Sequence, residues 1–255
     1  AAAIARHVSG SLPQRSQPDE NLRVRNLPQQ TTLLIVRHGE TDWNSEGRMQ
    51  GQLDIRLNEH GRNQAAEIAA VLQSSGLAER VDAIVSSDLS RASETADIIA
   101  KACPGARRRS DAGLREVHAG DVQGKLVHGE VQGVRANLSR GWSQGKFDER
   151  YPGGESITEV VARGLTALRK AASEGSCVVV VCHGGIIKWC AVHIELGSRL
   201  PTAETMALPE IRSITSASMP NCCTSTVQYD RETDSFHCKR WFEMLGRGAA
   251  LADVG

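Results

Sequence analysis

Residues 31–36 read TTLLIV, a short run of β-branched and apolar side chains that predicts a strand buried on both faces. Polar groups follow without a gap, because Arg37 and His38 come next. Residues 177–182, CVVVVC, form a second run of this kind, and His183 follows it directly. Strands buried on both faces indicate a sheet that is covered by helices on each side.

Helical patterns alternate with these strand-like runs. Asn58 is expected to cap a helix whose apolar residues recur at helical spacing. Residues 81–85, VDAIV, predict another strand, after which Asp88 is expected to cap a second helix. Ser156 and Glu159 form the capping-box signature of a third helix. The alternation predicts an α/β fold, a three-layer α/β/α sandwich with a mostly parallel central sheet and a phosphate pocket at the carboxyl ends of the strands.

The polar residues at the predicted strand ends suit phosphoryl transfer, which needs a nucleophile, fixed positive groups and an acid for the leaving oxygen. Arg37 and His38 end the first strand, and His183 ends the last within VCHGG. SSDLSRASETA, at 86–96, supplies Arg91 near the start of a helix, whose N-terminus favours anions. LREVHAGDVQG, at 114–124, supplies the carboxylate of Glu116.

At these residues the sequence resembles the histidine phosphatase superfamily, also called the phosphoglycerate mutase-like family, from about residue 32 to residue 245. In that family the histidine of the RHG motif attacks phosphorus. The resemblance therefore assigns the nucleophile to His38, the phosphate clamps to Arg37, Arg91 and His183, and the proton donor to Glu116. It also places four further residues around the phosphate or the neighbouring part of the substrate: Asn44, Gln50, Gly51 and the backbone of Gly184. The cycle that the resemblance implies requires no metal and no cofactor.

Three functions share this predicted site. The first is hydrolysis of a small phosphorylated metabolite, and the second is a mutase reaction in which phospho-His38 returns its group to another hydroxyl. Mutases of this family typically carry paired arginines after the acid, whereas the stretch from Glu116 to Tyr151 has none, which favours water as acceptor. The third is a catalytically silent protein that binds a phosphorylated partner. The predicted lid, at about 121–151, carries cations that suit a second phosphate or a carboxylate: Lys125, Arg135, Arg140, Lys146 and Arg150.

Some of these residues have plainer interpretations. Asn44 also suits a turn, and Gln50 a solvated loop. Three other carboxylates compete with Glu116 for the acid role: Glu130, Glu149 and Glu155. The tryptophans are expected to be packing residues, and Cys222 and Cys223 buried thiols.

The composition limits which partners and which cellular compartment are expected for the protein. The 255 residues carry 30 basic and 30 acidic side chains, so no global field favours nucleic acid or an anionic membrane as a partner. Seven cysteines without a C-x-x-C pair indicate a reducing compartment, cytoplasmic or organellar. Residues 1–30 are expected to form a flexible leader, either a transit-peptide remnant or a fragment boundary, and residues 246–255 a flexible tail. The oligomeric state stays open, a homodimer included.

Overall fold

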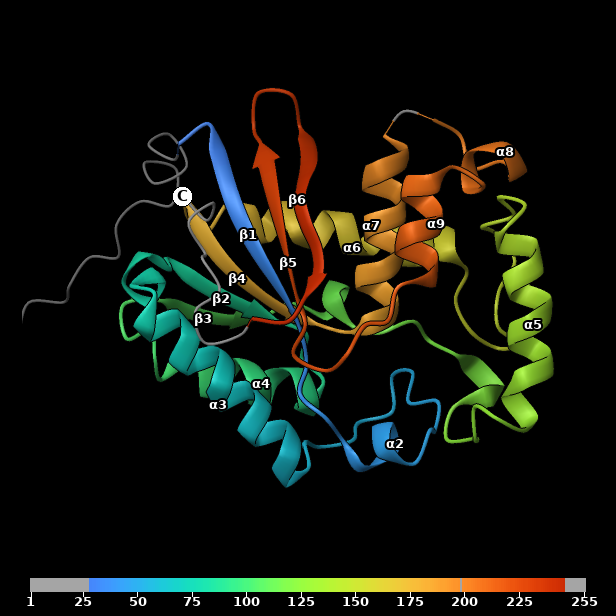
Figure 1. Ribbon diagram of the computed structural model, residues 1–255, viewed down its shortest axis with the longest axis horizontal. Coiled ribbons are helices and arrows are strands. Elements are labelled where there is room, and N and C mark those ends of the chain that lie inside the picture. Colours follow the sequence, from blue (N-terminus) through green and yellow to red (C-terminus); the bar gives the residue numbers. More distant parts are fainter. Residues whose placement is uncertain (1–27, 198, 246–255) are drawn as a thin grey trace, which may run out of the picture.

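The computed structural model describes residues 28–197 and 199–245 (Figure 1). The predicted tail lies outside the described residues, and so does nearly all of the predicted leader. Gln30, the last residue of the predicted leader, already belongs to the first strand. Within the described ranges, no helix is both long enough and apolar enough to cross a membrane.

A six-stranded mixed sheet forms the centre of the fold, in the order β3-β2-β4-β1-β5-β6. The strands are β1 (Gln30–Arg37), β2 (Ala83–Ser86), β3 (Arg107–Ser110), β4 (Cys177–Cys182), β5 (Thr224–Asp230) and β6 (Ser235–Glu243). The first four are parallel to one another, whereas β5 pairs with β1 and β6 with β5 in antiparallel fashion. The predicted α/β fold with a mostly parallel sheet is therefore confirmed.

Helices cover both faces of the sheet (Figure 1). On one side lie α3 (Glu59–Ser74) and α4 (Ser90–Ala100), and on the other α6 (Ile157–Ala172) and α7 (Gly184–Leu196). Alternate residues of β1 enter the two resulting cores, Leu34 on the α3–α4 side and Leu33 on the α6–α7 side. Both faces of β1 are buried, which explains why its sequence is continuously apolar.

Four further helices and three 3-10 turns complete the described part of the fold. They are the helices α2 (Asp42–Ser45), α5 (Glu130–Trp142), α8 (Ala203–Met206) and α9 (Pro209–Ser216), and the 3-10 turns η1 (Leu77–Arg80), η2 (Ala112–Leu114) and η3 (Gly120–Val122). The predicted lid contains α5, which stands apart from the sheet and faces α7 and α9 (Figure 1).

Two of the predicted helix caps are confirmed by side-chain hydrogen bonds to the first turn, those of Asn58 and Ser156. The third is wrong, because α4 begins after Leu89 without a side-chain cap. Asp88 instead pairs with Arg115, 2.5 Å away. The carboxylate at the start of α4 comes from Asp54, which accepts hydrogen bonds from the amide and the hydroxyl of Ser90. No local pattern marks this partner, because it lies 36 residues earlier in the chain.

Candidate active site

The ends of β1 and β4 bring the two predicted histidines together. Arg37, the last residue of β1, lies opposite Cys182, the last residue of β4, and the amide of His38 donates to the carbonyl of Cys182 at 3.0 Å. His183 follows Cys182 directly, so the rings of His38 and His183 lie with their centroids 5.1 Å apart. Arg91, in the first turn of α4, reaches the same point from the end of β2.

The side chain of His38 is held in one orientation. Its Nδ1 lies 2.7 Å from the carbonyl oxygen of Gly39. Because a carbonyl can only accept, Nδ1 carries the hydrogen of this bond, and the neutral ring keeps its lone pair on Nε2. Burial lowers the pKa of His38 well below its ordinary value of 6.5, with further lowering by the charges of Arg91 and Arg37. His38 therefore offers a neutral imidazole with a free Nε2 at neutral pH.

The second imidazole is fixed as a donor. Nε of Arg91 donates to Nδ1 of His183 at 3.2 Å, so the hydrogen of the neutral ring lies on Nε2. Burial and then the charge of Arg91 hold the pKa of His183 well below its ordinary value. Arg91 also donates to the carbonyls of Leu53 and Gly51, at 2.8 and 2.7 Å, and burial lowers its own pKa to about 10. These bonds occupy three of its five N–H groups and leave two for a ligand.

Buried polar atoms without a hydrogen-bond partner gather at this site. Four such side-chain atoms occur in the described part of the chain, and three belong to predicted site residues: Nε of Arg37, Oε1 of Gln50 and Nε2 of His183. The fourth, Nε of Arg109, lies 2.6 Å from the carboxylate of Glu174. An unpaired buried polar group costs about 1–3 kcal/mol. The site therefore suits an occupant that accepts hydrogen bonds from Arg37 and His183 and donates one to Gln50.

Glu116 lies at the N-terminus of α7, beside Gly184. Its Oε1 accepts from the amides of Val117 and Ile186, at 2.8 and 3.1 Å, and its Oε2 accepts from the amide of Gly185 at 3.0 Å. A Cβ at position 185 would lie 2.5 Å from Oε1, so only glycine lets the carboxylate come this close. Three backbone donors thus fix Glu116 at the edge of the pocket.

The three competing carboxylates are placed elsewhere. Glu130 pairs with Lys125 at 3.3 Å, and Glu155 pairs with Arg163 at 2.8 Å. Neither of them lines the cavity described below, and nor does Glu149. Among the described residues, Glu116 contributes the only carboxylate of the cavity wall. The geometry therefore favours Glu116 as the acid.

Two residues that the sequence did not single out support the site. Arg163 donates to the carbonyl of Glu116 at 2.9 Å while it pairs with the Glu155 carboxylate, so both residues support the backbone of the acid. Asn221 donates to the carbonyl of His38 at 3.0 Å and to Oδ1 of Asn44 at 3.2 Å. Neither residue lies in a motif, so no sequence signal identified them.

All four predicted substrate-contact residues line the cavity: Asn44, Gln50, Gly51 and Gly184. Asn44 also forms a capping box with Thr41, which confirms the turn interpretation, while its contact with the substrate stays a prediction. Gln50 is buried, so the alternative interpretation of Gln50 as a solvated loop group is wrong. Gly51 has a φ of +54°, which favours glycine, and its carbonyl orients Arg91. Gly184 lies beside Arg37, since a Cβ there would be 3.5 Å from Nε of Arg37.

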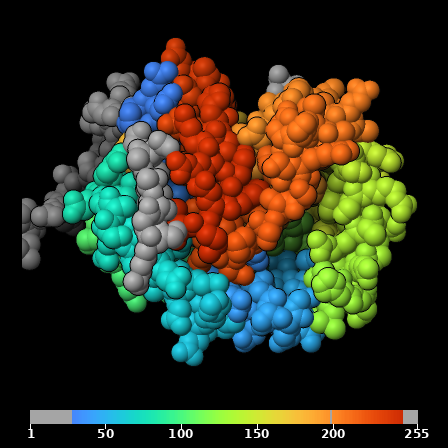
Figure 2. All heavy atoms as spheres, viewed as in Figure 1, coloured from blue at the N-terminus to red at the C-terminus, as the bar shows by residue number. Residues whose placement is uncertain are grey.

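The cavity over these residues has a volume of about 810 Å³. Figure 2 shows the surface hollowed where the segments of α9 (orange), α5 (yellow-green) and the loop around α2 (blue) meet. Trp142 and Trp189 form part of its wall, with ring centroids 5.1 Å apart. The expectation that the tryptophans only pack is therefore incomplete. The volume leaves room for an organic group beyond a phosphate.

The cysteines near the site are buried thiols, as predicted. Burial raises the pKa of Cys222 to about 12 and that of Cys223 to about 11, so neither forms a thiolate near neutral pH. All seven cysteines of the chain are free. Within the described residues, no group of three or more His, Cys, Asp or Glu side chains is arranged to hold a metal ion.

Comparisons with known proteins match these observations. The sequence profile of the histidine phosphatase superfamily (branch 1) matches residues 33–243. Phosphoglycerate mutase-like protein 4 of Arabidopsis thaliana is 42% identical over 159 residues, which cover 61% of this chain and 67% of that protein. The metal-independent phosphoserine phosphatase of Arabidopsis thaliana is 38% identical over 168 residues, 65% of this chain and 68% of that protein.

Among solved structures, a mycobacterial glucosyl-3-phosphoglycerate phosphatase superposes with a TM-score of 0.65 at 29% identity, covering 84% of this chain and 100% of that one. The profile match spans most of the described chain and includes every residue of the candidate site. The chain therefore belongs to the histidine phosphatase superfamily and is an enzyme of that superfamily.

Proposed function

We propose that this protein hydrolyses the phosphomonoester of a small phosphorylated metabolite, without a metal, through a phosphohistidine at His38. The observation that carries the proposal is the free Nε2 of a neutral, buried imidazole beside unpaired donors on Arg37 and His183. These donors suit the equatorial oxygens of a phosphoryl group, and an arginine fork binds such oxygens well.

In the first step, Nε2 of His38 attacks phosphorus and the bond from phosphorus to the ester oxygen breaks. Glu116, protonated in the substrate complex, gives its proton to the leaving oxygen, and an alcohol departs. The phosphorylated ring is now positive, and its Nδ1–H still donates to the carbonyl of Gly39, which stabilises that charge. Arg37, Arg91 and His183 hold the phosphoryl oxygens throughout.

In the second step, water attacks phosphorus from the side that the alcohol has left. Glu116, now a carboxylate, takes a proton from this water, and the bond between phosphorus and Nε2 breaks. Inorganic phosphate leaves, His38 returns to its neutral form and Glu116 is protonated again. The two steps consume one ester and one water, and they release one alcohol and one phosphate.

Two other functions remain candidates. A mutase reaction is supported by the likeness to phosphoglycerate mutase-like protein 4, but the stretch from Glu116 to Tyr151 lacks the paired arginines of family mutases. Hydrolysis is supported by the two phosphatases among the relatives described above. A silent binding protein is disfavoured, because all five proposed catalytic groups are present around one cavity.

A panel of phosphate esters tests the proposal. Each ester is incubated with the protein and EDTA, and both phosphate release and isomerisation of 3-phosphoglycerate, with and without its bisphosphate, are followed. We expect phosphate release from at least one alkyl ester, undiminished by EDTA. Isomerisation with little release would make the protein a mutase instead.

The pH dependence of kcat/KM is a second test. Because the pKa of His38 lies well below 6.5 in the free protein, the attacking base stays deprotonated as the pH falls through 6.5. We expect an acid limb with its midpoint below pH 6.5, measured with an aryl phosphate, which needs little help from the acid. A midpoint at or above 6.5 would mean that another group controls the attack.

A further inference from the structure

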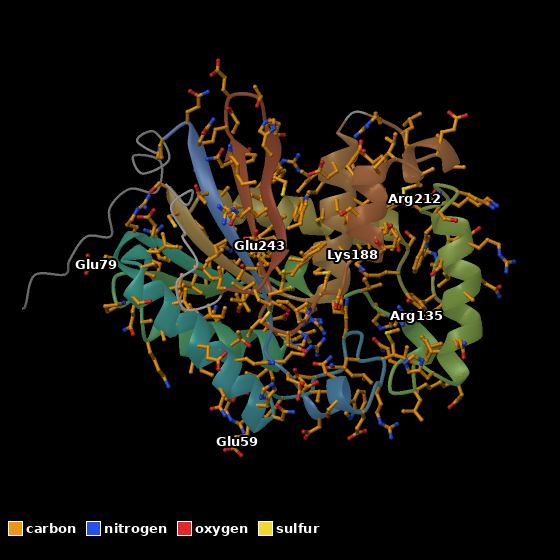
Figure 3. The ribbon with its side chains drawn as sticks, viewed as in Figure 1. Glu59, Glu79, Arg135, Lys188, Arg212 and Glu243 are labelled. Carbon is orange, nitrogen blue, oxygen red and sulfur yellow. The ribbon has the colours of Figure 1, made fainter. Side chains whose placement is uncertain are left out.

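The cavity continues beyond the proposed phosphate site, and three cations from three helices line that part. They are Arg135 of α5, Lys188 of α7 and Arg212 of α9 (Figure 3). In Figure 3, Lys188 and Arg212 lie on the α7–α9 side of the space that separates these helices from α5, and Arg135 lies on the α5 side. We call these three residues the distal cations.

Lys188 connects the two parts of the cavity. It lies four residues after Gly184 on α7, which places it one turn, about 6 Å, along the helix axis from the proposed phosphate site. Its Nζ donates to the carbonyls of Thr215 and Ala217, at 3.1 and 3.2 Å. Burial, and then the charges of Arg135 and Arg37, lower its pKa. Lys188 therefore interacts electrostatically with both Arg135 of α5 and Arg37 of the proposed phosphate site.

The charge of the distal cations is not compensated by the described protein. Arg135 and Arg212 have no side-chain hydrogen bond or ion pair to any described residue, whereas Arg48, which also lines the cavity, pairs with Glu46. Glu116 is the single carboxylate that the described residues place in the cavity wall, and three backbone amides already hold it. Converging cations without a protein counter-ion attract an anionic group of a ligand.

The space between the two parts suits a carbon frame with hydroxyl groups. Tyr151 is buried in the cavity wall, and its hydroxyl makes no hydrogen bond within residues 28–197 and 199–245. Burial raises the pKa of Tyr151, while the charge of Arg135 lowers it and that of Glu116 raises it, so the phenol lies within range of both charges. Trp142 and Trp189 supply apolar wall.

We propose that the distal cations bind a second anionic group of the substrate, a carboxylate or a phosphate on the alcohol that leaves. This inference rests on the proposed function. The substrate class is then a phosphomonoester with two separated anionic groups. The same reasoning disfavours an ammonium group near the second anion, because the described cavity wall offers it no free carboxylate.

Matched pairs of esters test the distal site. 3-Phosphoglycerate and glycerol 3-phosphate differ only in a carboxylate against a hydroxymethyl group, and propane-1,3-diol bisphosphate is compared with its monophosphate. We expect kcat/KM for at least one doubly anionic ester to exceed that of its partner by ~10-fold or more, as charge-assisted bonds allow. The pair with the larger ratio identifies the second group as carboxylate or phosphate. O-Phosphoserine, which carries an ammonium group in place of a hydroxyl, should be a poorer substrate than 3-phosphoglycerate.

The same types of substitution, made at residues inside and outside the cavity, test whether the distal cations cause the preference for doubly anionic esters. The preference should fall by ~10-fold in Arg135→Gln and in Lys188→Met. It should persist in Arg140→Gln, on the same helix, and in Lys146→Met, in the same segment, since neither residue lines the cavity. A preference that is unchanged by Arg135→Gln and Lys188→Met, or lost equally in the two controls, would overturn the distal site.

Equilibrium binding separates this proposal from the proposed function. The same pairs are titrated calorimetrically into His38→Ala, which cannot form a phosphohistidine. Tighter binding of the doubly anionic ester, lost when Arg135→Gln is added, would support the distal site even if no ester were hydrolysed. Hydrolysis that depends on His38 but shows a ratio near one for both pairs would overturn the distal site alone.

Discussion

Replacing His38 by alanine is expected to abolish phosphate release from every substrate, with kcat lower by on the order of 10⁴-fold or more. The imidazole supplies the atom that attacks phosphorus. His183 offers no second nitrogen with a free lone pair, because its Nδ1 accepts from Arg91 and its Nε2 carries the hydrogen. The variant should fold, since it removes a buried polar ring, and its thermal midpoint serves as the check. Phosphate release is measured with EDTA present.

His237→Ala is the matched control for this result. His237 is exposed on β6, and its side chain bonds only Ser235 within the described chain, so its loss should leave kcat unchanged. Turnover that survives His38→Ala in a folded protein would exclude the covalent mechanism.

Replacing Glu116 by glutamine should produce a loss that depends on the leaving group. For alkyl phosphates, whose alkoxide must be protonated, we expect kcat to fall by ~10²–10⁴-fold. For p-nitrophenyl phosphate, whose phenolate leaves unaided, the first step should be nearly unaffected. Its second step should be slow, because the base for water is missing. A burst of nitrophenolate equal to the enzyme concentration should therefore precede slow turnover.

Glu130→Gln is the control for this variant, because Glu130 carries the same group outside the cavity, paired with Lys125. The glutamine at 116 cannot accept from all three backbone amides, so a stability loss of about 1 kcal/mol is expected and is checked by thermal unfolding. Equal losses on alkyl and aryl esters, or an equal loss in Glu130→Gln, would remove Glu116 from the acid role.

The parts of the fold that the sequence predicted are those with a local cause. Residues 31–36 and 177–182 are continuously apolar because helices cover both sides of β1 and β4. β3 was not predicted, since its sequence, RRRS, has no strand pattern. A strand of charged residues is possible here because β3 lies at the edge of the sheet. Its arginines pair there with carboxylates such as those of Asp97 and Glu174. The pair of Arg109 with Glu174 joins residues far apart in the chain, so no local pattern marks it.

The same distinction applies to the site. Arg37, His38 and His183 were predictable because they lie in motifs at the ends of buried strands. Asn221 and Arg163 act through backbone carbonyls, which any residue provides, so no pattern in the sequence marks their partners. The sequence also could not predict that the distal cations lack a counter-ion among the described residues. Of the five lid cations that the sequence offered, only Arg135 lines the cavity, while Lys188 and Arg212 come from later helices.

The central claim is that the phosphoryl group passes through Nε2 of His38, and trapping that intermediate tests it most directly. Glu116→Gln is mixed with p-nitrophenyl phosphate, quenched at alkaline pH, where phosphohistidine survives, and digested for mass spectrometry. We predict one phosphate on the peptide that contains His38, absent after acid treatment and absent when His38→Ala is added. Phosphate on another residue, or continued turnover with no phosphorylated peptide, would contradict the mechanism.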